Sequence, residues 1–136
     1  MSQRDFEAEV LVEATISPSE DPSKVAAAVG NVVGADPKNV EIRQDSARFR
    51  TKDPRVLLRI KEKLRDRHVR SAARRQLLVN MKGRSTSLML NRQAAAGGVL
   101  ALCGAAEESP LGPIYLTIHS GRLSAAIEWV AAYDEG

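Results

Sequence analysis

The 136-residue chain carries a formal net charge of +3 and one cysteine, Cys103, which excludes an intrachain disulfide and suggests a reducing compartment. None of its apolar stretches reaches the ~20 residues of a membrane-spanning helix, and no basic-then-apolar leader opens it. We therefore expect a soluble, cytoplasmic protein without a membrane partner, in which Cys103 is a small buried hydrophobic side chain.

The first predicted element is a strand over residues 6–16, where apolar side chains alternate with largely acidic ones. Its period of two directs one face toward the core and the acidic face outward. A helix follows, because Asp21 can cap its amino end, Pro22 suits its first position and Gly34 can end it. Four valines at helical spacing should pack this helix on the sheet: Val25, Val29, Val32 and Val33.

A hairpin is predicted next, with strands around residues 40–42 and 47–49 and a reversal near residues 45–46. Its alternate positions should face away from the core: Glu41, Arg43, Arg48 and Arg50. Asp53 and Pro54 then repeat the cap-and-proline signature of a helix start. That helix is mostly charged, with one narrow apolar stripe: Val56, Leu57, Ile60 and Leu64.

The helical periodicity slips around His68, which predicts a break before a second helix over residues 69–79, closed by Gly83. The loop expected at residues 104–113 contains two prolines and two glycines. Three further strands are expected, at residues 85–91, 99–103 and 114–118. A short C-terminal helix is expected around four apolar residues: Leu123, Ile127, Trp129 and Val130.

This order of elements, with short links and hairpins, predicts an α+β fold. We expect a two-layer sandwich in which helices cover one face of a mainly antiparallel sheet. The sequence shows no internal repeat and no low-complexity tail, so we expect one domain over residues 1–136.

Charge is strongly segregated along the chain. Residues 43–92 hold 16 of the 20 basic residues and four of the 17 acidic ones, which gives +12 there and −9 in the remainder. Such a basic segment is typical of a protein with an anionic partner. On the helix after Asp53, six basic residues accompany only two acidic ones, so pairing between neighbouring turns cannot neutralise them.

These charges predict an RNA-binding protein whose cations form one shared surface, left unneutralised by the carboxylates nearer the termini. Aromatic side chains are few, and Phe6, Phe49 and Tyr115 sit in predicted core or strand positions. We therefore expect contact with the backbone of structured or duplex RNA and weak sequence preference. Eight residues are the candidates for phosphate contact: Arg48, Arg50, Arg55, Arg59, Lys63, Arg70, Arg74 and Arg75. Solvated helix charge, or a heat-adapted or GC-rich source, is the alternative explanation of the arginines.

Catalytic and metal sites are not predicted. His68 and His119 lack a cysteine or carboxylate at metal-ligand spacing, and no G-x-S-x-G motif or Walker lysine is present. Glu107 and Glu108 fall in a predicted loop, where a solvated pair is the ordinary explanation. We expect a non-catalytic protein without a cofactor. The alternatives are a protein-interaction module, such as a homodimer whose acidic strand face meets a basic surface, and an enzyme acting on a phosphorylated small molecule.

The stretch LNRQAAAGG, residues 90–98, places a polar triplet beside small residues. Phosphate cradles put glycines ahead of a helix, whereas Gly97 and Gly98 follow the small residues and lead into a predicted strand. We expect Asn91 to cap about one helical turn that forms a close-packed junction, with Arg92 and Gln93 presented to RNA.

Four segments, in order, resemble those of a family of small archaeal proteins identified as predicted RNA-binding proteins: PSEDPSKVAAAVGNVV, RSAARRQLL, LNRQAAAGG and ESPLGPIYLTI. The resemblance spans nearly the whole chain. Its most specific positions are Asn91, Arg92, Gln93, Ala94, Ala95, Pro110, Leu111 and Gly112. Arg92 stands where lysine is common in the family, which keeps the charge, and residues 96–98 are smaller than expected. The resemblance implies the fold of the ribosomal protein that binds 5S ribosomal RNA, and membership of an RNA-processing complex through a suggested link to the exosome.

Overall fold

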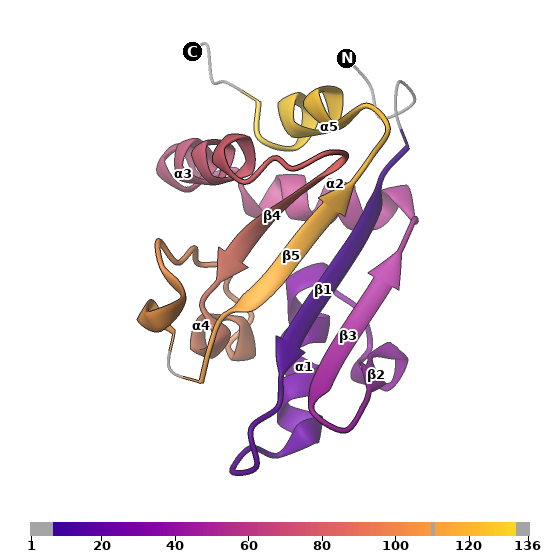
Figure 1. Ribbon diagram of the computed structural model, residues 1–136, viewed down its shortest axis with the longest axis vertical. Coiled ribbons are helices and arrows are strands. Elements are labelled where there is room, and N and C mark those ends of the chain that lie inside the picture. The colour runs from indigo at the N-terminus through magenta and orange to yellow at the C-terminus, as the bar shows by residue number, and fades with distance from the viewer. Residues whose placement is uncertain (1–6, 110, 133–136) are drawn as a thin grey trace.

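The structure is a computed structural model that describes residues 7–109 and 111–132 (Figure 1). Its described part contains one antiparallel sheet of five strands in the order β2-β3-β1-β5-β4. The strands are β1 (Glu9–Thr15), β2 (Glu41–Ile42), β3 (Ser46–Thr51), β4 (Ser85–Leu90) and β5 (Ile114–His119). The helices are α1 (Pro22–Val33), α2 (Pro54–Lys63), α3 (Arg67–Val79), α4 (Arg92–Ala96) and α5 (Leu123–Val130), with 3₁₀ turns η2 (Pro37–Asn39) and η3 (Ala106–Glu108).

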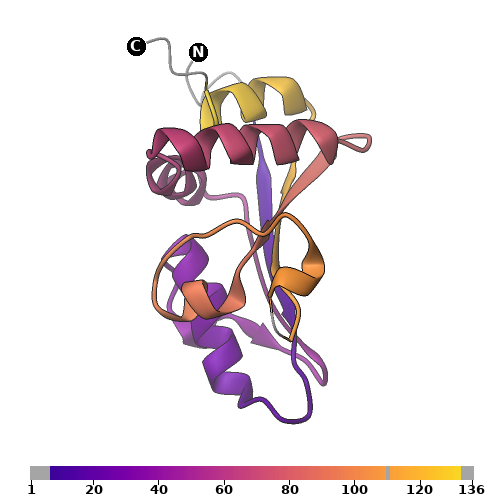
Figure 2. The same cartoon turned by 90° about the vertical axis from the view of Figure 1, so that its left-hand side faces the viewer.

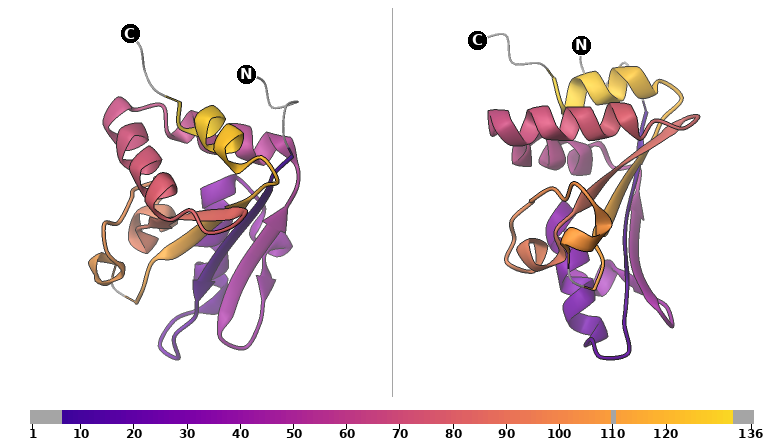
Figure 3. Two further views of the ribbon diagram at one scale, coloured as in Figure 1. Left: turned by 45° about the horizontal axis from the view of Figure 1, so that its top comes forward. Right: turned by 60° about the vertical axis from the view of Figure 1, so that its left-hand side comes forward.

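The two faces of the sheet differ in what covers them. Inward residues of the central strands β1 and β5, such as Val12 and Leu116, are fully buried under the helices. Helices α1 and α2 lie behind the sheet, and no helix in the described part of the chain covers its other face, which we call the bare face (Figure 2). Helix α5 lies beside α3 at one end of the sheet (Figure 3). The α+β fold with an antiparallel sheet and helices on one face is therefore confirmed.

Helix α1 begins and ends as the sequence predicts. The Asp21 carboxylate accepts a hydrogen bond from the Ser23 amide, Pro22 occupies the first turn, and Gly34 ends the helix with a φ of 71°. Few side chains tolerate this left-handed conformation. A Cβ at Gly34 would also meet the end of the exposed Arg59 side chain, which can move aside, so the positive φ is the reason that glycine is needed there.

The break between the next two helices lies earlier than predicted. Helix α2 starts at Pro54 after the Asp53 cap, as expected, but the break falls before Asp66, whose carboxylate accepts hydrogen bonds from the amides of His68 and Val69. This cap starts α3 at Arg67, two residues ahead of the predicted start. The predicted last residue, Val79, is confirmed, but the predicted closing residue is wrong, because Asn80 and not Gly83 caps α3.

The predicted strand over residues 99–103 is wrong. The segment makes an isolated bridge with β4, between Leu90 and Leu102, with hydrogen bonds of 2.9 Å from the Cys103 amide to the Met89 carbonyl and 2.8 Å from the Asn91 amide to the Ala101 carbonyl. A short apolar run is compatible with a strand or with a segment that covers a sheet edge, and periodicity does not separate the two. Cys103 itself is 1% exposed, which confirms its prediction as a buried hydrophobic residue.

Two amide side chains from α3 close the outer edge of β4. The Met89 amide donates to the Gln76 Oε1 at 3.2 Å, and the Asn80 Nδ2 donates to the Ser87 carbonyl at 2.9 Å. Gln76 also donates from Nε2 to the Cys103 carbonyl at 2.6 Å. Unpaired groups on an edge strand are templates for pairing with another chain, and these bonds remove several of them.

The first strand is shorter than predicted, since β1 runs from Glu9 to Thr15. Phe6, at the start of the predicted strand, lies outside the described residues. The alternation itself is confirmed: Val10, Val12 and Ala14 are buried, while Glu9, Leu11 and Glu13 are partly exposed on the bare face.

Candidate nucleic-acid interface

The structure distributes the ten sequence-predicted contact residues over both faces of the molecule. Arg48 and Arg50 lie on β3, on the bare face of the sheet. The others lie on the helices: Arg55, Arg59 and Lys63 on α2, Arg70, Arg74 and Arg75 on α3, and Arg92 and Gln93 on α4. They do not all share one surface.

Carboxylates of β1 pair with the arginines of β3. Antiparallel register sets Glu13 opposite Arg48, and their side chains approach to 3.1 Å. Arg50 reaches the diagonal neighbour Glu9 at 3.6 Å. The expectation that the basic residues stay unneutralised therefore fails on the sheet, because the predicted acidic face of the first strand lies directly beside them.

Arg92 is a structural residue and is not presented to RNA. It is 6% exposed, and its Nη1 donates to the Thr15 carbonyl and to the Glu20 carboxylate at 2.8 Å each. Its Nε donates to the Gly112 carbonyl at 3.1 Å. The prediction that Arg92 is available to RNA is wrong, because three distant backbone and side-chain acceptors converge on its guanidinium.

The carboxyl group of Glu20 is tuned by this arrangement. Burial favours its neutral form, but the hydrogen bond from the Ser17 amide and the Arg92 guanidinium outweigh burial and hold the pKa of Glu20 below its ordinary value. Glu20 is therefore ionised at neutral pH, where it forms an ion pair with Arg92.

The junction predicted for residues 90–98 is confirmed. The Asn91 Oδ1 accepts from the Ala94 amide at 2.9 Å and caps α4. Ala95 is buried against α1, where the Asn31 Nδ2 donates to the Ala95 carbonyl at 3.0 Å. The small side chains of this turn permit the close approach of α4 to α1. Gln93, which the sequence predicts to be presented to RNA, is exposed.

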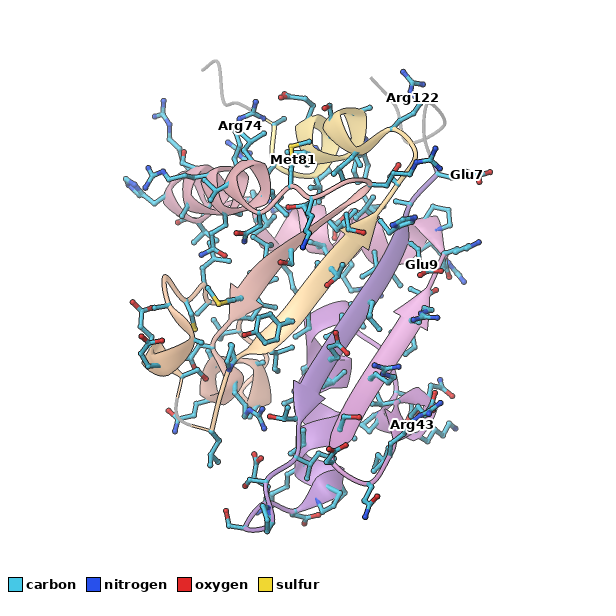
Figure 4. All side chains as sticks on the ribbon, viewed as in Figure 1. Glu7, Glu9, Arg43, Arg74, Met81 and Arg122 are labelled. Atoms are coloured by element: carbon cyan, nitrogen blue, oxygen red, sulfur yellow. The ribbon has the colours of Figure 1, made fainter. Side chains whose placement is uncertain are left out.

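Two further candidates have carboxylate partners. Arg74 is largely buried between α3 and α5, where it pairs with Glu128 and donates to the Ala131 carbonyl at 3.2 Å (Figure 4). Arg55 is exposed and pairs with Asp53 at 2.8 Å. The hydrogen bond from the Arg55 side chain, and then the one from its backbone amide, hold the pKa of Asp53 below its ordinary value.

Helices α2 and α3 nevertheless keep an excess of positive charge. Residues 53–79 contain nine basic and three acidic residues, a net charge of +6. Arg59 and Arg75 are exposed, and no carboxylate in the described part of the chain pairs with either. Arg65, which is outside the predicted contact set, is exposed in the same way and lies in the link between α2 and α3.

Two lysines of α2 donate hydrogen bonds to backbone carbonyls, which do not neutralise a positive charge as a carboxylate would. Lys63 donates to the Asn31 carbonyl at 2.7 Å, and Lys61 donates to the Trp129 carbonyl at 2.8 Å with its ammonium 4.9 Å from the centre of the indole ring. Burial, and secondarily the charge of Arg59, lowers the pKa of Lys63.

Tyr115 faces the bare side of the sheet and is 39% exposed, so its strand position does not place it in the core. His119 lies directly opposite Glu9 in the register of β1 and β5, and its Nδ1 lies 2.9 Å from Ser85 Oγ. Within the described residues, no group of three or more His, Cys, Asp or Glu side chains could hold a metal ion. No helix among them is long and apolar enough to cross a membrane.

The architecture defines the class of protein: an α+β protein in which helices cover one face of a five-stranded antiparallel sheet. The chain belongs to the archaeal UPF0201 family. It is 34% identical over 125 residues to a UPF0201 protein of Sulfurisphaera tokodaii, with 89% of this chain and 85% of that protein covered. No family model matches the chain.

Solved structures agree with this assignment. A UPF0201 protein from Methanococcus jannaschii is 25% identical with a TM-score of 0.73, and 94% of this chain and 96% of that chain are covered. A crystal structure of an uncharacterised UPF0201 protein gives a TM-score of 0.76 at 23% identity over the same shares of the two chains. The second likeness shows the fold alone.

Proposed function

We propose that this protein is a non-catalytic, cytoplasmic RNA-binding protein that contacts phosphates with the exposed cations of α2, of α3 and of the link between them. The observation that carries the proposal is the net charge of +6 on residues 53–79, of which Arg59, Arg65 and Arg75 are exposed without carboxylate partners in the described part of the chain. Counterion release from a nucleic-acid backbone would favour binding to such a surface.

The proposal narrows the contact set that the sequence predicts. The proposed contact set excludes Arg48 and Arg50, which pair with carboxylates, and Arg74 and Arg92, which are buried. It adds Arg65. Contacts through helix cations reach phosphates and not base edges, so RNA shape decides binding and sequence preference is weak. The resemblance to predicted RNA-binding proteins and to the 5S-RNA-binding ribosomal fold, with the suggested exosome link, supports an RNA partner as an analogy of fold.

A fluorescence titration with a structured RNA tests the proposal. The triple variant Arg59→Ala/Arg65→Ala/Arg75→Ala removes three charges from the helices, and Lys24→Ala/Lys38→Ala/Arg43→Ala removes three exposed charges elsewhere. We expect the first variant to bind about tenfold or more weakly and the second to bind within about twofold of the parent. Equal losses in both variants would mean that only net charge matters, which overturns the proposal.

The bare sheet face favours a second candidate function, a protein-interaction module. Its charges are paired, and it also exposes Tyr115 and part of Leu11 and Met89. Such a face suits a protein partner better than a polyanion. Light scattering of the pure protein tests the homodimeric form. A protein that is still monomeric at about 100 μM, a concentration far above the dissociation constant expected of an interface of standard size, would contradict it.

A further inference from the structure

A hollow of about 620 Å³ opens where the start of β1, the end of β5 and the start of α2 converge. Glu7 and Glu9 mark this end of β1 in Figure 4. The volume falls within the range of about 300–1,000 Å³ that is usual for small-molecule sites. None of the basic residues in the proposed RNA contact set lines it.

The hollow has an apolar side and a polar side. Ala8, Pro54 and Leu57 supply the apolar lining, and Lys52 and His119 are among the polar groups. Lys52 is exposed and has no carboxylate partner in the described part of the chain. His119 uses Nδ1 for Ser85, which leaves its other ring nitrogen for a ligand.

The acidic groups of the lining limit what can bind. Glu9 is partly compensated by Arg50 at 3.6 Å, whereas Glu7 is exposed with no ion pair in the described part of the chain. Two carboxylates oppose a ligand with several phosphates and accept hydrogen bonds from hydroxyl groups. A wholly apolar ligand would leave the polar groups of the lining unpaired.

We propose that this hollow binds one ribonucleotide unit, either a free nucleoside monophosphate or the terminal nucleotide of an RNA strand. The base packs on Ala8, Pro54 and Leu57, and the phosphate contacts Lys52. Carboxylate oxygens of Glu7 or Glu9 accept hydrogen bonds from the ribose hydroxyls, as acidic residues do in dinucleotide sites. A hydroxyl-bearing ligand with a single phosphate fits this lining better than a polyphosphate does.

The position of the hollow suits the RNA terminus. It opens at the amino end of α2, the exposed residues Arg55 and Arg59 lie along that helix, which is ~15 Å long, and Arg65 follows two residues after its last residue. The end of an RNA strand that is bound by these cations would therefore reach the hollow. This part of the inference rests on the proposed function, whereas binding of a free nucleotide does not.

Two-dimensional NMR titrations with AMP, dAMP and adenosine test the inference. We expect AMP to shift the amide resonances of residues 7–9, 52–53, 55–57 and 119–121, and dAMP to bind several-fold more weakly because it lacks the 2′-hydroxyl. Lys52→Ala should weaken AMP about tenfold and leave adenosine unchanged, and the control Lys24→Ala should change neither. No shifts with AMP up to about 10 mM, or AMP binding indifferent to Lys52→Ala, would overturn it.

The helix variant separates the two proposals. Arg59→Ala/Arg65→Ala/Arg75→Ala should keep AMP binding while losing RNA affinity. AMP binding in a protein that fails to bind RNA would leave the hollow as a site for free nucleotides. RNA binding without AMP binding would reject the hollow and leave the helix surface in place.

Discussion

Arg92 on α4 and Glu20 before α1 form a buried ion pair, with 2.8 Å between Nη1 and Oε2 and side-chain exposures of 7% and 12%. The pair joins residues 72 positions apart and holds the loop ahead of α1 against α4. Because the guanidinium also binds the Thr15 and Gly112 carbonyls, its hydrogen bonds connect three separate segments.

Removing Arg92 should therefore destabilise the fold. We expect Arg92→Ala to lower the free energy of unfolding by about 3–5 kcal/mol, since Glu20 loses its ion-pair partner and the Thr15 and Gly112 carbonyls lose a donor. The exposed pair of Arg43 with Glu41 is the control, and Arg43→Ala should cost less than about 1 kcal/mol. Urea unfolding measures both. An Arg92→Ala protein of unchanged stability would show that Arg92 does not hold these segments together.

The same pair makes stability depend on pH. A carboxyl group whose pKa is lower in the folded state stabilises the fold above its unfolded pKa, and this contribution is lost as the pH falls through the folded pKa. We expect stability to fall below about pH 4 and the Glu20→Gln variant to show a shallower decline. Urea unfolding between about pH 3 and 6 measures it. Parallel profiles for the two proteins would contradict the role given to Glu20.

Closure of the β4 edge by Gln76 is testable by substitution. Gln76→Ala leaves the Met89 amide and the Cys103 carbonyl without their partner, and should cost about 1–3 kcal/mol and increase aggregation. Gln44→Ala, on an exposed turn, is the matched control. Unfolding curves and light scattering at rising concentration report the two effects. Equal behaviour of the two variants would show that the edge needs no such protection.

The thiol of Cys103 should be nearly inert in the folded protein. Burial, and then the charge of Glu108, raises the pKa of Cys103 and keeps the thiol protonated at neutral pH. We expect its reaction with an aromatic disulfide reagent to be at least about a hundredfold slower than in denaturant. A rate in the native protein that matches the denatured one would contradict the packing of residues 99–103.

Sequence reasoning locates the helix starts after Asp21 and Asp53, because a cap and a following proline are local signals, but it misses the start of α3 at the Asp66 cap, which no proline follows. It failed where the answer depends on distant partners. The pairing of Arg48 with Glu13 follows from the register of strands 35 positions apart, and charge counts along the chain do not contain that register. Residues 99–103 were misassigned because an apolar run beside a sheet has the pattern of a strand.

The salt dependence of RNA affinity tests the central claim most directly. If phosphates meet the helix cations, the logarithm of affinity falls linearly with the logarithm of salt concentration, and the variant lacking Arg59, Arg65 and Arg75 shows a slope smaller by about 2 to 3. The matched variant lacking Lys24, Lys38 and Arg43 should keep the slope of the parent. Affinity indifferent to salt, or a parental slope in the helix variant, would contradict the account.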